Sequence, residues 1–125
     1  MRSLTMLLGL CATPIARCFS EDCPCLSSLD DYGLSGTLNV LLSGQTYTYP
    51  EGYGIRSCAK HDENLPPFCE GNASKPAWCA DSWCYVDPLL CNTNTAQSSY
   101  FPKLFYSYAT CGATNTFHEW FEVSG

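Results

Sequence analysis

Cysteine is the residue type in this sequence with the clearest chemistry. Ten cysteines occur in 125 residues, and six of them, from Cys58 to Cys111, follow the spacing C-x10-C-x9-C-x4-C-x6-C-x19-C. Thiols this dense in a small domain usually form disulfides that replace part of a hydrophobic core. The spacing therefore predicts a domain held together by disulfides.

Residues 1–20 have the organisation of a secretory leader. A basic start is followed by the apolar stretch Leu4–Ala12 and by small residues, with cleavage expected after Ala16 or Cys18. The apolar stretch is shorter than the roughly 20 residues that cross a bilayer, and the sequence predicts no transmembrane segment. We expect a signal peptide or targeting leader at 1–20 and one domain at 21–125.

Removal of the leader leaves an even number of cysteines, which can form four disulfides. Eight cysteines allow 105 pairings, so the sequence assigns no partners. Only one residue separates the first two, which makes a bridge between them unfavourable, and each should bond a distant cysteine. The expected disulfide cysteines are Cys23, Cys25, Cys58, Cys69, Cys79, Cys84, Cys91 and Cys111.

Catalytic and metal sites are less well supported. His61 and His118 each precede a carboxylate, but no Gly-x-Ser-x-Gly element accompanies them and the cysteines are expected to be oxidised. Paired C-x2-C zinc spacing and a twelve-residue calcium loop are both missing from the sequence. We expect no catalytic residues, metal or cofactor, and we expect the acids to be solvated, among them Asp62, Glu63, Glu70, Asp81 and Asp87.

Aromatic residues are concentrated between Trp78 and Tyr108. In a disulfide-rich domain such rings more often fill the core, and a face for a sugar or a protein is the alternative. Recognition through these rings requires that at least one of four side chains be exposed. These candidate binding residues are Trp83, Tyr85, Tyr106 and Tyr108.

The expected elements are short. Alternating apolar residues at 37–42 and 45–49, separated by Ser43-Gly44, predict a hairpin. A turn of helix is expected within 27–32 and another over 77–81, where Pro76 precedes it, and a strand is expected at 82–86. The fold class is a small disulfide-rich, mainly β and irregular single domain with one or two short helical turns.

The charge balance excludes two classes of partner. After the leader, four Lys and Arg residues stand against twelve Asp and Glu, a net charge of −8. Nucleic acids and anionic membrane surfaces attract clusters of basic residues, which this chain does not contain. A glycosylation sequon, Asn72-Ala-Ser74, fits passage through a secretory compartment.

Four segments together resemble a small cysteine-rich module of algal and protist secreted proteins and ectodomains. They are Tyr53–Asp62, Pro67–Cys69, Pro76–Pro88 and Tyr106–Gly112, and the likeness extends over about 49–117. The module has no established activity. Its usual setting implies a recognition or accessory role outside the cytoplasm.

We therefore expect a non-catalytic, secreted or extracytoplasmic domain that recognises a protein or glycan partner. The alternative is a structural accessory subunit on the lumenal or external face of a membrane complex, including an algal photosynthetic one in the thylakoid lumen or another organelle lumen. Such a subunit associates peripherally with the membrane. A small secreted hydrolase is the third option.

Overall fold

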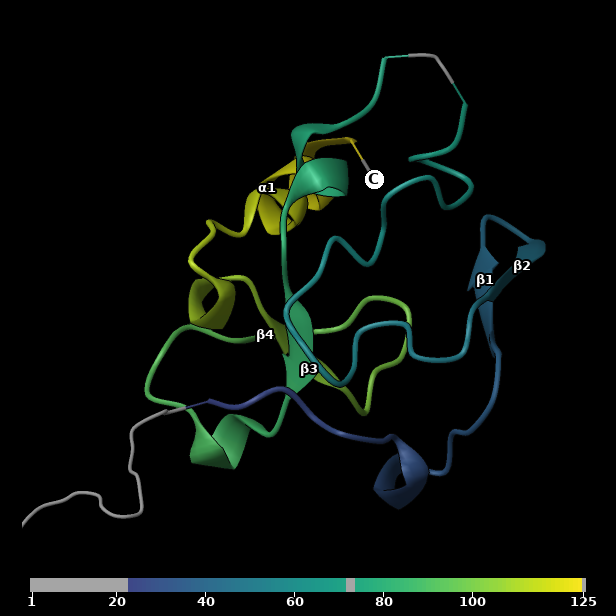
Figure 1. Ribbon diagram of the computed structural model, residues 1–125. Helices are drawn as coiled ribbons and strands as arrows, with labels where there is room; N and C mark the ends of the chain where they lie inside the picture. The colour runs from purple at the N-terminus through teal and green to yellow at the C-terminus, as the bar shows by residue number, and fades with distance from the viewer. Residues whose placement is uncertain (1–22, 72–73, 125) are drawn as a thin grey trace, which may run out of the picture.

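The computed structural model describes residues 23–71 and 74–124 (Figure 1). The leader expected at residues 1–20 and the sequon residue Asn72 lie outside this range. Within these residues the chain forms a small domain of short strands, 3-10 turns and irregular segments, as its cysteine content and its turn-forming residues predict.

The predicted hairpin is confirmed. Strands β1 (Leu38–Leu42) and β2 (Gln45–Tyr49) pair antiparallel, with Leu38 opposite Tyr49. Ser43 and Gly44 both have positive φ, 53° and 81°, which is the turn geometry that matches the twist of a two-residue hairpin. In Figure 1 the hairpin lies to one side of the molecule.

A second sheet forms the centre of the domain. Strands β3 (Cys84–Val86), β4 (Ala96–Gln97) and β5 (Phe105–Ser107) lie in the order β3-β5-β4, all antiparallel. The β3 strand falls within the predicted segment 82–86. Four 3-10 turns connect the described elements: η1 (Asp30–Tyr32), η2 (Ala77–Ala80), η3 (Pro88–Leu90) and η4 (Ala109–Cys111).

The helix α1 (Thr116–Ser124) is an element that the sequence analysis did not assign. Its start has a local cause, because Asn115 Oδ1 accepts a hydrogen bond from the backbone N–H of His118 at 2.9 Å, as an N-cap does. Phe117, Trp120 and Phe121 follow at helical spacing and pack on the core. The helix lies beside η2, as Figure 1 shows.

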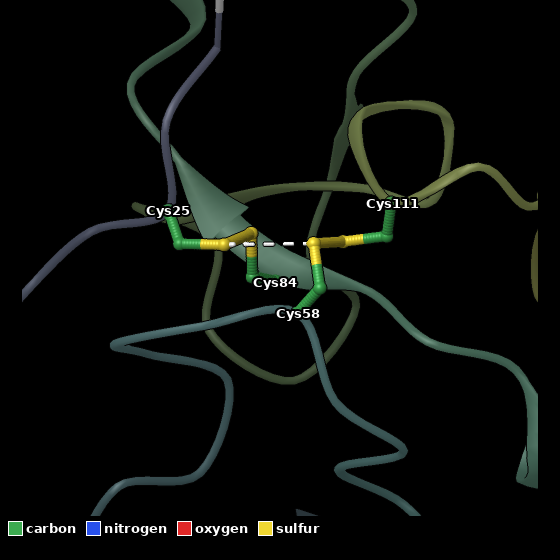
Figure 2. A group of neighbouring side chains, drawn as sticks. All are labelled: Cys25, Cys58, Cys84 and Cys111. Atoms are coloured by element: carbon green, nitrogen blue, oxygen red, sulfur yellow. Dashed lines mark hydrogen bonds between the residues drawn. A yellow bond between two sulfur atoms is a disulfide. The ribbon is translucent and has the colours of Figure 1, made fainter. Parts of the chain in front are cut away.

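Four disulfides join the eight expected cysteines in the described part of the chain. Three bridges connect residues far apart in sequence and one closes a short loop, and both Cys23 and Cys25 bond distant partners as predicted. The pairs are Cys23–Cys91, Cys25–Cys84, Cys58–Cys111 and Cys69–Cys79, with sequence separations of 68, 59, 53 and 10. Figure 2 shows that two of the long-range bridges are neighbours.

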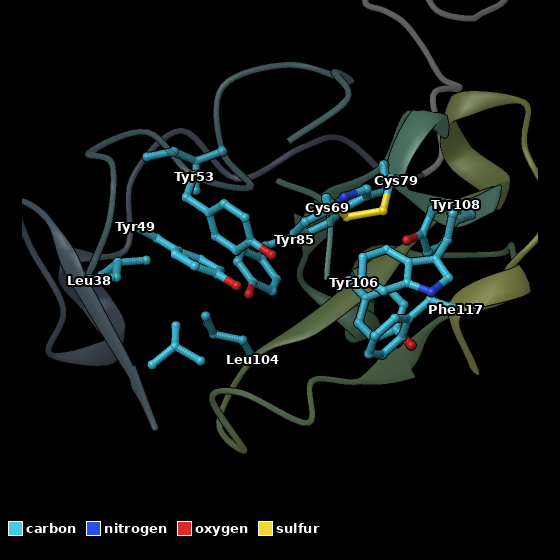
Figure 3. Close-up of a cluster of buried hydrophobic side chains, with 14 of the residues drawn as sticks. Leu38, Tyr49, Tyr53, Cys69, Cys79, Tyr85, Leu104, Tyr106, Tyr108 and Phe117 are labelled. Atoms are coloured by element: carbon cyan, nitrogen blue, oxygen red, sulfur yellow. A yellow bond between two sulfur atoms is a disulfide. The ribbon is translucent and has the colours of Figure 1, made fainter. Parts of the chain in front are cut away.

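Strand β3 separates two buried clusters. The larger is aromatic and extends from Leu38 of the hairpin to Phe117 of α1, with Tyr85 between them (Figure 3). On the other side of the strand, Cys84 and Val86 pack with Cys23 in a small cluster bordered by disulfides. Successive residues of a strand point to opposite faces, so β3 contributes to both.

Candidate functional site

Recognition through the four candidate rings requires that at least one of them be exposed, and the structure does not meet this condition. Trp83, Tyr85, Tyr106 and Tyr108 are all buried, and none is more than 6% exposed. The edge of β3 that does not pair with β5 is also covered. Tyr85 N–H donates to the Gly54 carbonyl at 2.7 Å, and short antiparallel pairings join Cys25 to Val86 and Ala59 to Trp83. The alternation of side chains along the strand separates its two faces, but both faces of β3 are buried.

These rings surround a buried carboxylate. Asp62 is 6% exposed, which corrects the expectation of a solvated acid at this position. Its Oδ1 accepts a hydrogen bond from the Tyr53 hydroxyl, and its Oδ2 accepts one from Trp83 Nε1 at 2.9 Å. Burial raises the pKa of Asp62 to about 6, although both hydrogen bonds act to lower it.

His61, next to Asp62 in sequence, makes contacts of its own. Its Nε2 lies 3.0 Å from the Ser57 carbonyl, and its ring packs edge-on against Trp83 with centroids 5.2 Å apart. Partial burial lowers its pKa, while the backbone hydrogen bond opposes that shift. These contacts give His61 a structural role.

The space beside Asp62 is too small for an organic ligand. The hollow lined by Tyr53, Asp62, Trp83 and Tyr85 has room for about 20 Å³, close to the volume needed by one water molecule. The aromatic cluster around Asp62 is therefore part of the core. The remaining acid groups that we singled out are exposed or half-buried, as expected.

A larger concave surface lies between β4 and the start of α1. Two hollows of about 540 and 190 Å³ meet there, and they share Thr95, Tyr106 and Asn115. We call this surface the β4 groove. Besides the three shared residues, its two hollows are lined by Asn94, Ala96, Gln97, Ser99, Tyr108, Ala109, Ala113, Thr114, Phe117, His118 and Phe121.

The lining of the β4 groove combines aromatic residues with neutral polar groups. Tyr106, Phe117 and Phe121 supply the rings, and Asn115 Nδ2 donates to the Tyr106 hydroxyl at 3.4 Å. Gln97 Nε2 donates to the Pro102 carbonyl at 2.7 Å, which fixes that amide at the edge of the groove. Among the lining residues that the structure describes, none is Asp, Glu, Lys or Arg.

Of the four candidate binding residues, Tyr106 and Tyr108 line this groove, whereas Trp83 and Tyr85 do not. Phe121 and Asn115 were not among the residues predicted from the sequence. Their signal was the sequence Asn115-Thr-Phe-His, an N-cap residue before apolar residues at helical spacing. That pattern indicates a helix, but not which strand the helix faces.

Potential metal ligands come together at one place in the described ranges. The sulfur atoms of Cys25, Cys58, Cys84 and Cys111 all lie within 4.8 Å of one another. They are paired in two disulfides, and a disulfide sulfur is not the thiolate that binds a metal.

No family model, curated protein or solved structure matches this chain in comparisons with known proteins. None of the helices in residues 23–71 and 74–124 has the length and apolar content needed to cross a membrane. Multiple disulfides indicate an oxidising, extracytoplasmic compartment. The chain is a small cysteine-rich domain with four disulfides.

Proposed function

We propose that the protein is a non-catalytic binding domain and that the β4 groove binds a neutral glycan. The observation that carries this proposal is the pairing of aromatic rings with amides and hydroxyls in a concave surface without formal charge in its described lining. The larger hollow, about 540 Å³, lies within the range of about 300–1,000 Å³ typical of ligand sites.

The chemistry of the groove favours a sugar over a charged ligand. A sugar ring has an apolar C–H face that packs on an aromatic ring and hydroxyls that pair with amide and hydroxyl side chains. Phe121 is half-buried and Gln97 is exposed, so both present atoms to a ligand. The net charge of −8 after the leader disfavours anionic ligands.

Phe121→Ala tests the aromatic part of the site. We expect the intact domain to retain neutral oligosaccharides on a glycan array and the variant to bind them at least about tenfold more weakly, because an anchor ring in an interface contributes about 2 kcal/mol or more. Leu41→Ala is the control, since Leu41 is exposed on the distant hairpin. Both variants should keep the near-ultraviolet circular dichroism of the parent.

Gln97→Ala tests the polar part, with Gln45→Ala as a matched control. Both glutamines are exposed, but Gln45 lies in β2 and away from the groove. We expect weaker glycan binding for Gln97→Ala only. Absence of binding to every neutral glycan on the array, or unchanged binding by both groove variants, would refute the proposal.

A structural accessory subunit is the second candidate function, and a different observation favours it. Leu89 and Leu90 of η3 are adjacent and highly exposed, at 91% and 60%. Adjacent exposed leucines suit an apolar contact with another protein. The likeness of 49–117 to the algal and protist module agrees with a place on the lumenal or external face of a membrane complex, including one in the thylakoid lumen.

The two functions separate by fractionation of the source cells. An accessory subunit should co-fractionate with membrane proteins at a constant ratio, and Leu89→Ser with Leu90→Ser should release it. A free glycan-binding domain should appear in the soluble extracytoplasmic fraction, and the same two substitutions should leave its glycan binding unchanged.

A further inference from the structure

Two disulfides lie in contact on the side of β3 away from Asp62. The bridge Cys25–Cys84 and the bridge Cys58–Cys111 approach each other so closely that the sulfurs of Cys25 and Cys58 are 3.9 Å apart (Figure 2, dashed line). All four sulfurs lie within 4.8 Å of one another. The contact between the two bridges is not needed to hold the chain together, because each bridge links its own two segments without the other.

The two bridges differ in access to solvent. In one bridge Cys58 is exposed and Cys111 is half-buried, whereas in the other Cys25 is half-buried and Cys84 is fully buried in β3. A thiol in solution can therefore reach the Cys58–Cys111 bridge before it reaches the other. The described bridge Cys69–Cys79 has both cysteines buried and is not part of this group.

We propose that these four cysteines form a thiol–disulfide exchange site in which an external thiol starts a rearrangement of the two bridges. Exchange proceeds when a thiolate attacks a disulfide sulfur and displaces the other sulfur as a thiolate. A sulfur released from the exposed bridge starts within 4.8 Å of both sulfurs of its neighbour, so it needs only a small displacement to attack. The proposal is independent of the β4 groove.

The reaction balances without net oxidation. The external thiol loses its proton, its sulfur bonds to Cys111, and Cys58 leaves as a thiolate. Cys58 then bonds to Cys25, and Cys84 leaves. Cys84 attacks the mixed disulfide at Cys111, which forms Cys84–Cys111 and returns the external thiol with its proton.

This cycle converts one set of two bridges into another. The pairs Cys25–Cys84 and Cys58–Cys111 are the state that the structure shows, and exchange needs a thiol to begin. The N-terminal segment that carries Cys25 is tied to β3 in one state and to the loop of Cys58 in the other.

Cys111→Ser tests the central step without any reductant. The substitution leaves Cys58 unpaired, and we expect the variant to form a Cys25–Cys58 or Cys58–Cys84 bridge and to carry its free thiol on the displaced cysteine. The sample is quenched in acid, unfolded and alkylated, and the labelled cysteine is identified by peptide mass spectrometry. Label confined to Cys58 would overturn the proposal.

Cys79→Ser is the matched control, because it also frees a single cysteine. Cys69 then has no second disulfide within reach in the described ranges, and the label should remain on Cys69. Migration of the label in this variant as well would show general scrambling and would overturn the assignment of a specific site.

A second measurement uses the unaltered protein, so that failure of Cys111→Ser to fold does not remove the test. The domain is treated with limiting glutathione and mapped in the same way. We expect a Cys25–Cys58 or Cys58–Cys84 bridge to appear while Cys69–Cys79 stays intact. Opening of Cys58–Cys111 with Cys25–Cys84 unchanged would contradict the proposal.

Discussion

The two sides of β3 are stabilised in different ways. On the side of Tyr85, many rings pack edge to face, for example Trp83 on Tyr85 with centroids 5.0 Å apart, and a single bridge of sequence separation 10 is present. On the side of Cys84, the buried cluster has only three members, and three long-range bridges border it. Covalent links are concentrated where apolar burial is smallest.

This contrast follows from the size of the domain. A chain of about 100 residues buries a limited area, and aromatic side chains contribute about 150–250 Å² each. Once Trp83, Tyr85 and their neighbours fill one side, little apolar surface remains for the other. Disulfides provide the missing stability there by restricting the unfolded chain.

Full reduction should have the largest effect. Each bridge contributes about 2–4 kcal/mol and small domains are stable by only about 5–15 kcal/mol, so loss of four bridges should unfold both sides of β3. Near-ultraviolet circular dichroism in excess reductant measures this directly. A native-like aromatic signal under those conditions would show that the ring cluster is stable by itself.

Gly54→Ala should damage the aromatic side selectively. Gly54 has a φ of +79°, and a Cβ there would lie 2.3 Å from Cδ2 of Tyr85, whose ring is held in the core. Positive φ costs about 1–2 kcal/mol and overpacking costs about 1–3 kcal/mol more. Chemical denaturation should show a loss of about 2–5 kcal/mol.

Gly36→Ala is the control for backbone strain alone. Gly36 has a similar φ of +67°, and nothing lies within 4 Å of a Cβ built there. We expect a loss of about 1–2 kcal/mol. Equal losses for the two variants would mean that the ring of Tyr85 moves freely, against the close packing of this side.

Asp62→Asn should remove a pH dependence from the aromatic side. The folded pKa of Asp62, about 6, exceeds its ordinary value of 3.8, so folding favours the protonated acid. The stabilisation is complete below pH 3.8 and is lost as pH rises through 6, by about 3 kcal/mol in total. The difference in unfolding free energy between parent and variant, measured from pH 4 to 7, should follow this curve; a flat difference would refute it.

Among the four changes to the domain, Tyr53→Phe should reduce stability least. It removes the hydroxyl that donates to Asp62 and leaves the ring in place, at a cost of about 2 kcal/mol at pH 7, where the acceptor is charged. Tyr47→Phe on the hairpin, where Tyr47 is only half-buried, should change stability by less than about 0.5 kcal/mol. Similar losses in both would show that the hydrogen bond to Asp62 contributes little.

The local parts of the fold were predictable. The hairpin followed from alternating residues around Ser43-Gly44, whose turn needs positive φ, and the turn at 77–80 followed from Pro76. Helix α1 was also encoded locally, by Asn115 and the spacing of Phe117 and Phe121, and was overlooked. Short-range patterns determine these elements because their hydrogen bonds join residues close in sequence.

The candidate site was only half predictable. Aromatic and polar residue types suited to recognition are visible in the sequence, and Tyr106 and Tyr108 do line the β4 groove. All four candidate rings lie in the core, and Trp83 and Tyr85 do not reach the groove, because segments distant in sequence cover β3. Alternation separates two faces of a strand and does not state whether either is solvated.

By itself, the sequence determined that this is a small acidic domain with four disulfides, and it determined the hairpin. Only the tertiary structure decided which cysteines pair, that two bridges touch at Cys25 and Cys58, and that Asp62 is buried beneath Tyr53 and Trp83. The physical reason is that these properties depend on contacts between residues 9 to 68 positions apart. Composition and spacing specify the groups that can interact, whereas packing of distant segments selects the ones that do.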